Sequence, residues 1–302
     1  MKRKRIGLML LLSSFIVMIE AARGDERWEV TPEQLRRSLE ILRAGIGGDE
    51  FWPAMHAAEA LTLAGHANFV IAGLSDRLPA ERDDQRRCGL ARELVRAGDR
   101  GALPILLGIL GDPDSTGRVH AAESLFKLGE QGDGHELRAA LEQTTLPQLQ
   151  LWAAAALANA RRGEDPQASA LSSEGMALIR KRLLSDDRPA RVTAAFALSQ
   201  VGNASDIAPL QEALSRESDE VTRAYFTSAL AKLGDAAGRR ESIANLRSEN
   251  ASVKALAAET AGHARLFDGQ SELIRLLDDP VTDVRIRAAQ SLLVLSLATG
   301  KR

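Results

Sequence analysis

An internal repeat of about 32 residues constrains the fold of this chain more than any other feature. A Leu, replaced by Ala in one copy, recurs near the end of a pattern of small residues, and we use it as the anchor of each copy. Consecutive anchors are 31 to 33 residues apart, except for one separation of 41. The anchors are Leu61, Leu94, Leu125, Leu157, Leu198, Leu230, Ala261 and Leu292. Because a fixed period of this length is typical of repeat architectures, we predict one elongated array and not two globular domains.

The residues within each copy predict a helical hairpin. Paired alanines precede several anchors, for example Ala194 and Ala195, and their small side chains let neighbouring helices approach closely. Acidic loops such as residues 112–114 provide N-caps and favourable charge at helix starts. Because aromatic residues make up only 4% of the chain and strand-type alternation is absent, we expect an all-α fold. A Gly four residues after the anchor predicts a left-handed helix C-cap at Gly65, Gly98, Gly129, Gly202 and Gly234.

A basic residue recurs seven positions before the anchor, near the start of the same helix. The pattern predicts a ladder of contacts between these side chains and the acidic loops, which would tie one repeat to the next. The alternative is a surface that reads the charge of a partner. The column consists of Arg87, Arg118, Arg191, Arg223, Lys254 and Arg285.

Residues 1–22 have the composition of a secretory signal peptide. A basic start at residues 2–5 precedes a 14-residue apolar run, and Ala21 and Ala22 suit cleavage. The run is shorter than the roughly 20 residues that span a bilayer, so we expect export to the periplasm or the medium. Because Glu20 fits the cleavage site poorly, an uncleaved membrane anchor is the alternative. Loss of the segment changes the formal net charge from −2 to −5, which argues against a nucleic-acid partner.

The remaining chain divides into a terminal helix and the repeat array. Residues 23–48 predict an N-terminal capping helix, with Thr31 as N-cap and Pro32 in the first turn. Residues 49–302 predict a solenoid of about eight hairpins, whose concave side is a curved groove. The longest anchor separation predicts a polar insertion loop at 161–175. That loop is either a tolerated surface insertion or a segment that contacts a partner.

The period, the acidic loops and the pattern Val-Arg-x-x-Ala-Ala-x-x-Leu, best seen at residues 283–292, resemble the HEAT-like repeats of the phycobilisome (PBS) lyase class. The resemblance covers about 250 residues and implies a right-handed α-α superhelix. It is specific for fold and not for function, because such solenoids host unrelated roles. Deoxyhypusine hydroxylase, a member of this class, holds iron with adjacent His-Glu dipeptides on the anchor helices. Here the one such dipeptide, His135-Glu136, falls on the other helix of its hairpin, so the resemblance implies the scaffold without the oxygenase.

The anchor helices are expected to line the concave groove. Positions two and five before the anchor lie opposite the apolar stripe when the helix is drawn at 100° per residue. Their side chains are ionisable in the N-terminal half and aromatic in the middle, and the aromatic ones either fill space between helices or anchor a partner. The predicted binding residues are His56, Glu59, Arg92, His120, Glu123, Trp152, Phe196 and Tyr225.

Two His-Ala-Ala-Glu stretches raise the question of a metal site. A His and a Glu three residues apart on a helix are near enough to share an ion. The two pairs lie two repeats apart, about 20 Å at typical helix spacings, and one pair alone gives too few ligands. We therefore predict no metal and no cofactor. We expect His56 and His120 instead to form hydrogen bonds with Glu59 and Glu123, one helical turn away. No nucleophile–base set, phosphate loop or zinc spacing occurs, so we predict no catalytic residue.

Together these features predict an exported scaffold, without catalysis, that binds a protein or peptide partner in its groove. Contact with a membrane is expected only if the N-terminal segment is retained. One alternative is an enzyme, either a PBS-lyase-like chromophore-handling protein or an oxidoreductase related to the iron hydroxylases. An intracellular bilin lyase conflicts with the export signal. A third possibility is carbohydrate binding through the aromatic side chains.

Overall fold

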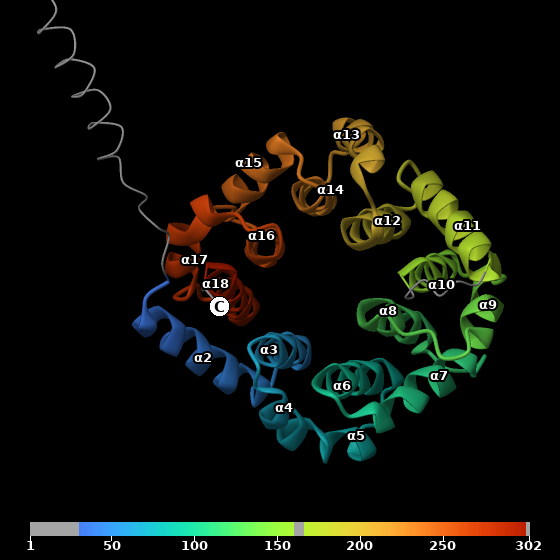
Figure 1. Ribbon diagram of the computed structural model, residues 1–302, viewed down its shortest axis with the longest axis horizontal. Coiled ribbons are helices and arrows are strands. Elements are labelled where there is room, and N and C mark those ends of the chain that lie inside the picture. Colours follow the sequence, from blue (N-terminus) through green and yellow to red (C-terminus); the bar gives the residue numbers. More distant parts are fainter. Residues whose placement is uncertain (1–29, 160–165, 300–302) are drawn as a thin grey trace, which may run out of the picture.

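The computed structural model describes residues 30–159 and 166–299, and within these ranges every regular element is a helix. The helices form two concentric layers that close into a ring (Figure 1). The inner layer consists of α3 (Phe51–Leu63), α6 (Asp84–Ala97), α8 (Arg118–Leu128), α10 (Pro147–Asn159), α12 (Arg188–Val201), α14 (Glu220–Lys232), α16 (Ala251–His263) and α18 (Thr282–Thr299). The outer layer consists of α2 (Pro32–Ile46), α4 (Ala67–Leu74), α5 (Arg77–Ala80), α7 (Leu103–Gly111), α9 (His135–Leu141), α11 (Pro166–Arg182), α13 (Ile207–Arg216), α15 (Ala236–Asn245) and α17 (Gln270–Leu276). Short 3-10 helices, η1 (Arg100–Ala102), η2 (Ala204–Asp206) and η3 (Phe267–Gly269), precede α7, α13 and α17.

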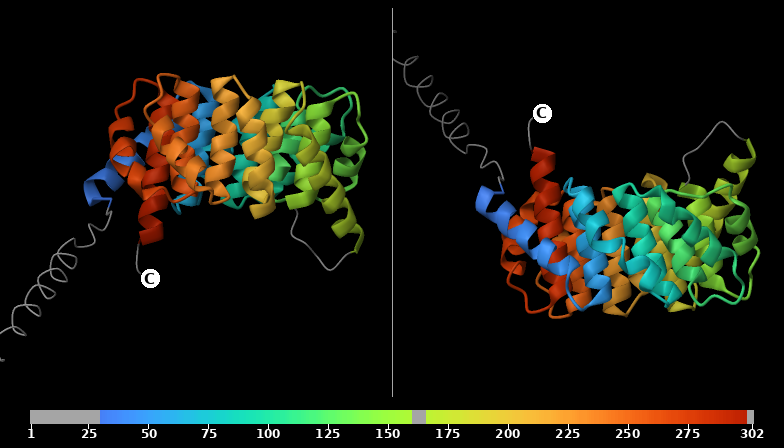
Figure 2. Two further views of the ribbon diagram at one scale, coloured as in Figure 1. Left: turned by 90° about the horizontal axis from the view of Figure 1, so that it is seen from above. Right: turned by 90° about the horizontal axis from the view of Figure 1, so that it is seen from below.

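The predicted repeat is confirmed as a stack of helical hairpins. Each outer helix leads into the inner helix that follows it, and the anchors and their paired alanines lie on the inner helices. Side views show the helices of both layers running across the thickness of the ring, with the end of α18 projecting beyond its edge (Figure 2). The alanine pairs are fully buried, which allows neighbouring inner helices to pack closely. They are Ala57 and Ala58, Ala121 and Ala122, Ala194 and Ala195, and Ala288 and Ala289.

Most helix ends follow the predicted capping chemistry, but the acidic loop at 112–114 does not cap α8, whose N-cap is Gly117. Acidic and amide side chains cap the inner helices α6, α12, α14 and α16, where Asp83, Asp187, Asp219 and Asn250 accept hydrogen bonds from the first turn. Four of the five predicted glycines have positive φ, whereas Gly202 is extended, with φ −72°. A Cβ at Gly202 would lie 2.4 Å from the Leu198 carbonyl oxygen, so close approach and not handedness requires glycine there. In the seventh copy Arg265 takes the left-handed conformation instead, with φ 51°.

The ends of the repeat array meet, so the expectation of an open groove is wrong. The last inner helix, α18, packs against both α2 and α3. At this contact, which we call the seam, a Cβ at Gly45 would lie 2.9 Å from Ile286 Cδ1. The rotation from each hairpin to the next accumulates to a full turn, and the concave side becomes the lumen of a ring.

The terminal helix has a different role from the one predicted. Its start is confirmed, because the Thr31 side chain and the Gln34 side chain form a capping box at the N-terminus of α2. However, α2 is the outer helix of the first hairpin and packs on α18, so it does not cap an open end. The predicted signal peptide at 1–22 lies outside the described residues.

The expected insertion loop at 161–175 is helical over much of its length. Residues 161–165 lie outside the described ranges, and α11 begins at Pro166. Within α11, a Cβ at Gly175 would lie 2.9 Å from the Ala154 carbonyl oxygen of α10. The helix therefore lies directly on α10 at that glycine, which adds stacked surface to the outer layer. Among the described residues, no helix combines the length and the apolar character needed to cross a membrane.

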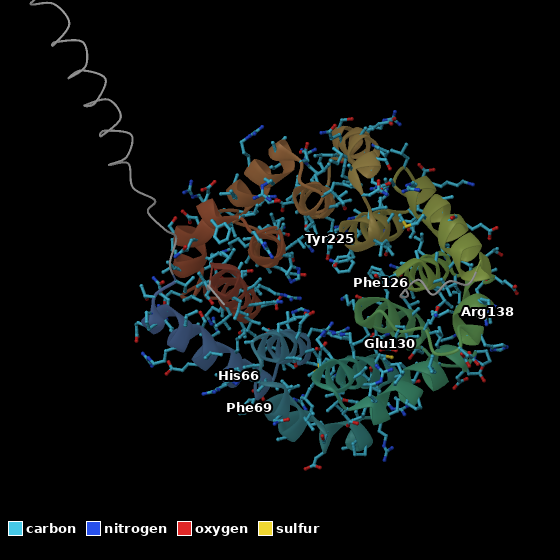
Figure 3. All side chains as sticks on the ribbon, viewed as in Figure 1. His66, Phe69, Phe126, Glu130, Arg138 and Tyr225 are labelled. Carbon is cyan, nitrogen blue, oxygen red and sulfur yellow. The ribbon has the colours of Figure 1, made fainter. Side chains whose placement is uncertain are left out.

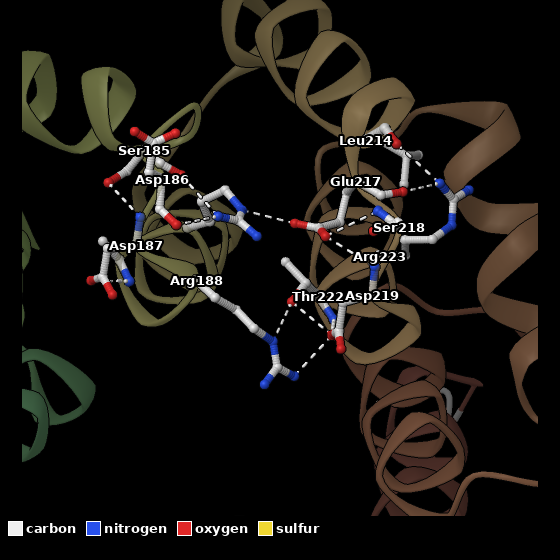
Figure 4. A network of polar contacts seen from close by, with 12 residues as sticks. Ser185, Asp186, Asp187, Arg188, Leu214, Glu217, Ser218, Asp219, Thr222 and Arg223 are labelled. Atoms are coloured by element: carbon white, nitrogen blue, oxygen red, sulfur yellow. Dashed lines mark hydrogen bonds and ion pairs between the residues drawn. The ribbon is translucent and has the colours of Figure 1, made fainter.

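The basic column makes fewer contacts between repeats than predicted. Its recurring partner is a backbone carbonyl at the end of the preceding outer helix or its loop: Arg118 donates to Leu110, and Arg223 to Leu214. Members of the column also join neighbouring repeats, because Arg191 donates to Glu217 and Lys254 donates to Asp279. Outside the column, Arg188 makes a further contact between repeats by donating to Thr222 and Asp219 (Figure 4). These guanidinium groups therefore satisfy carbonyls at helix C-termini as well as join neighbouring hairpins.

Candidate functional site

A cavity of about 410 Å³ lies at the centre of the ring and takes side chains from each inner helix. Tyr225 lies at the inner edge of the ring, whereas Arg138 lies at its outer edge (Figure 3). Most lining positions are nine, five or two residues before the anchor, or two after it, which is one face of a helix. The charged and aromatic lining residues are His56, Glu59, Arg96, Glu123, Phe126, Lys127, Phe196, Tyr225, Glu259, His263, Asp283 and Arg287.

The structure brings five of the eight predicted binding residues to this cavity, namely His56, Glu59, Glu123, Phe196 and Tyr225. The other three are not among its lining residues. Arg92 is 5% exposed and donates to Glu93 over 2.7 Å, and His120 stacks on Trp52 with ring centroids 5.5 Å apart. Trp152 is 7% exposed and packs between Phe126 and Phe196, so it fills space between helices. Binding by any of the eight stays a prediction.

The two His-Ala-Ala-Glu stretches, residues 56–59 and 120–123, differ in the contacts of their histidines. His120 Nδ1 lies 3.6 Å from Glu123, within one turn as expected. His56 Nδ1 instead lies 2.6 Å from Asp283 Oδ1 on α18. The first stretch therefore belongs to the seam. Its histidine contacts Asp283 only because the ring closes, and the sequence around His56 does not indicate this partner.

An ion-pair network surrounds the seam side of the cavity. Arg287 of α18 lies 3.3 Å from Glu59 and 3.6 Å from Glu259. Arg96 of α6 approaches the other oxygen of Glu59, at 3.2 Å. One carboxylate on α3 thus connects α6 with α18, and one guanidinium on α18 connects α3 with α16. The network links the two ends of the repeat array through charged groups.

Burial and ion pairing set the protonation of these groups in opposite ways. Burial would raise the pKa of Glu59 and Glu259, but Arg287 and the other nearby cations hold both below the usual range, Glu259 at about 2. Burial lowers the pKa of both His56 and His263, because a charged ring is poorly solvated there. At neutral pH the cavity therefore holds ionised carboxylates beside neutral imidazoles.

A fully buried carboxylate lies behind the lining. Glu93 of α6 is 0% exposed, accepts from Arg92 Nε over 2.7 Å and also pairs with Arg96. It occupies the position one before the anchor, which the helical pattern assigns to the apolar face. Sequence reasoning missed it for that reason, although its two flanking arginines are visible in the sequence.

Two lysines approach one aromatic ring at the other side of the cavity. Lys127 Nζ of α8 lies 5.2 Å from the Phe196 ring centroid, and Lys232 Nζ of α14 lies 5.7 Å from it. Tyr225 extends the aromatic surface, with its ring centroid 6.5 Å from that of Phe196. Cation–π attraction positions both ammonium groups. Lys127 also pairs with Glu123 over 2.6 Å.

The column two residues after the anchor lines the cavity, although its residues were not among the predicted binding residues. Its cavity-lining members are Arg96, Lys127, Asn159, Gln200 and His263, and Lys232 shares the position. We expected His263 to follow a helix end, but it is the last residue of α16 and lines the cavity. The signal was present, because six of the eight copies have a polar residue here.

Within the described ranges, no three His, Cys, Asp or Glu side chains are grouped closely enough to hold a metal ion. The dipeptide His135-Glu136 lies at the start of α9 in the outer layer, away from the cavity.

Part of the chain matches a known family of helical repeats. A family model described as HEAT repeats matches residues 71–158, which span α6, α8 and α10 with their outer helices. Residues 71–158 are HEAT repeats. The described part of the chain is an all-α solenoid of stacked helical hairpins, as the sequence predicted. None of the curated protein sequences matches this chain.

Solved structures similar to this HEAT-like solenoid include one enzyme and several engineered proteins. Human deoxyhypusine hydroxylase in complex with glycerol is 20% identical, with 87% of this chain and 97% of that chain covered and a TM-score of 0.42. One engineered protein is 21% identical, with 87% and 78% covered and a TM-score of 0.32. A second engineered protein is 19% identical, with 87% and 97% covered and a TM-score of 0.27.

Proposed function

We propose that this protein is a non-catalytic binding scaffold whose central cavity holds a short segment of a peptide or protein partner. The observation that carries the proposal is the cavity of about 410 Å³, which is lined by side chains from each inner helix, most of them charged or aromatic. Its volume lies in the range of small-ligand sites, which is too small for a folded domain. A chain end or a few side chains of a partner fit this space.

The lowered pKa values of the carboxylates that line the cavity favour binding over catalysis. A general acid or base works best when its pKa lies near the operating pH. Here the cationic neighbours hold the pKa of Glu59, Glu123 and Glu259 below the usual range, away from neutral pH. Such paired carboxylates position other groups and provide charge complementarity, which suits recognition.

We also propose that the protein is exported and acts outside the cytoplasm, with no nucleic-acid partner. Support comes from the basic residues 2–5, the apolar run that follows and the acidic charge of the remaining chain. Membrane contact is proposed only for a chain that retains residues 1–22. Sequencing the N-terminus of the protein isolated from the exported fraction tests cleavage, because a cleaved signal peptide predicts a start near residue 23, whereas an intact Met1 would contradict cleavage and favour the membrane anchor. Recovery of the protein only from the cytoplasm would contradict export.

The cavity assignment is tested by selecting peptides from a display library on the purified protein. The selected peptides are then measured against Gln200→Trp, because Gln200 is an exposed cavity-lining residue that a bulky ring would replace. Ser215→Trp, on the exposed outer helix α13, is the matched control. We expect binding to be lost only in Gln200→Trp. Equal binding to both variants would place the site outside the cavity and contradict the proposal.

A further inference from the structure

The two lysines beside Phe196 differ in how their ammonium groups are satisfied. Lys127 Nζ donates to Glu123, whereas Lys232 Nζ is buried and has no hydrogen-bond partner in the described part of the chain. A buried ammonium without an acceptor is costly, because it has lost water and gained nothing in exchange. A strong donor with unused capacity therefore lies against Phe196, which lines the cavity, although Lys232 itself is not among the lining residues.

The charges around Lys232 do not supply that acceptor. Glu259 and Glu59 attract its charge from a distance, while Arg287 and Lys127 repel it. Both glutamates already pair with Arg287. Two ammonium groups that approach the same ring also repel each other. A single negative group placed between them would remove this repulsion and accept hydrogen bonds from both.

Deepening the proposed function, on which this inference rests, we propose that the cavity recognises a carboxylate held between Lys127 and Lys232 beside the Phe196 ring. The neighbouring rings of Phe196 and Tyr225 favour a carboxylate attached to an apolar or aromatic group. Glu123 and Glu259 line the same cavity, so a ligand with several negative charges is disfavoured. A peptide C-terminus and a free aromatic carboxylate share the required chemistry.

Two matched probes test the carboxylate directly. N-acetylphenylalanine carries an aromatic ring and one carboxylate, and N-acetylphenylalanine amide differs only in lacking the charge. Titration calorimetry on the full-length protein should show that the acid binds roughly tenfold or more tightly than the amide, as expected for a charge-assisted hydrogen bond. A C-terminal peptide ending in phenylalanine, compared with its amidated form, separates a peptide source from a free acid. If the ligand is a peptide C-terminus, the peptide that ends in phenylalanine should bind more tightly than N-acetylphenylalanine, because its preceding residues add contacts. If the ligand is a free acid, the added residues should give no gain in affinity.

Substitutions locate the site. Lys232→Met keeps the length of the side chain and removes its charge, and it should weaken binding of the acid by about tenfold while leaving the amide unchanged. Lys181→Met is the control, because Lys181 is exposed on the outer helix α11. If Lys232→Met fails to fold, Lys127→Met tests the same placement, because the proposal predicts a similar loss for the acid alone, and the acid–amide comparison on the unmodified protein still decides whether a carboxylate is recognised.

The outcomes separate this inference from the proposed function. Equal affinity for acid and amide, with both lost in Gln200→Trp, would overturn carboxylate recognition and leave the cavity as a binding site. Unchanged binding of the acid in a folded Lys232→Met variant would overturn its assignment to the two lysines, and unchanged binding in Gln200→Trp would overturn its placement in the cavity. No saturable binding of the acid would also overturn the inference, and the peptide selection would then judge the cavity separately.

Discussion

His56 Nδ1 lies 2.6 Å from Asp283 Oδ1, and this contact joins the first inner helix to the last across 227 residues of sequence. The neighbouring pair Arg287 and Glu59 makes a second bridge of the same kind. These contacts connect the two ends of a repeat array that would otherwise present unpaired surfaces. The seam therefore determines whether the inner face is an open groove or an enclosed cavity.

The first prediction is that mild acid destabilises the ring. Burial lowers the pKa of His56 and His263 in the folded state, so the unfolded chain binds more protons between the unfolded pKa, about 6.5, and the folded values. The free energy of unfolding should then fall as the pH drops below about 6.5. Urea denaturation at several pH values measures this change.

A matched variant separates the histidines from the carboxylates. The lowered pKa values of Glu59, Glu123 and Glu259 mean that their contribution is lost only below the unfolded value of about 4.5. The double variant His56→Gln, His263→Gln should therefore lose the pH dependence between about 5 and 6.5 and keep the decline at lower pH. A double variant with the same slope as the unmodified protein would refute this assignment.

The second prediction concerns the left-handed residue Arg265. A side chain in this conformation costs about 1 kcal/mol relative to glycine, so Arg265→Gly should raise the free energy of unfolding by up to about 1 kcal/mol. The equivalent residue in the second copy is Gly98, with φ 109° and open space around a built Cβ. Gly98→Ala should therefore lower the free energy by a similar amount. Thermal melts of both variants test the pair, and a loss of stability in Arg265→Gly would contradict it.

The third prediction concerns the buried carboxylate Glu93. Glu93→Leu should lower the free energy of unfolding by about 3–5 kcal/mol, because it leaves Arg92 buried without its acceptor. Adding Arg92→Leu should restore most of the loss, since Arg96 keeps its contact with Glu59. Chemical denaturation measures all three proteins. A single variant as stable as the unmodified chain would show that the pair contributes little.

The fold was predictable to the level of the hairpin. The anchors, the alanine pairs and the acidic N-caps are local features that the period of 31 to 33 residues repeats, and each predicted a helix or a helix end. Gly202 shows the limit of that reasoning, because the same residue type serves a close approach to Leu198 instead of a left-handed turn. A single position in a pattern does not distinguish these two uses of glycine.

Closure of the ring was not predictable from these local features. It depends on a small rotation between neighbouring hairpins, and a modest error in that rotation changes a ring into an open spiral. The complementarity of His56 with Asp283, and of Glu59 with Arg287, is present in the sequence. It becomes meaningful only when the first and last inner helices are known to be neighbours.

The most direct test of the account is whether the seam exists in solution. A Cβ at Gly45 would lie 3.3 Å from Ile286 Cγ1, one bond from Ile286 Cβ, which is within the reach of a disulfide. The native Cys88 is buried, and burial raises the pKa of its thiol to about 12, so it will not compete.

We expect the Gly45→Cys, Ile286→Cys double variant to form an intramolecular disulfide under mild oxidation, detected by intact mass and thiol titration. The Gly45→Cys, Leu297→Cys control should stay reduced, because Leu297 is 65% exposed near the end of α18. Disulfide formation in the first variant alone is the result that a closed ring predicts. Two engineered thiols that both stay free in the first variant under the same oxidation, beside the native Cys88, would contradict closure and with it the central cavity.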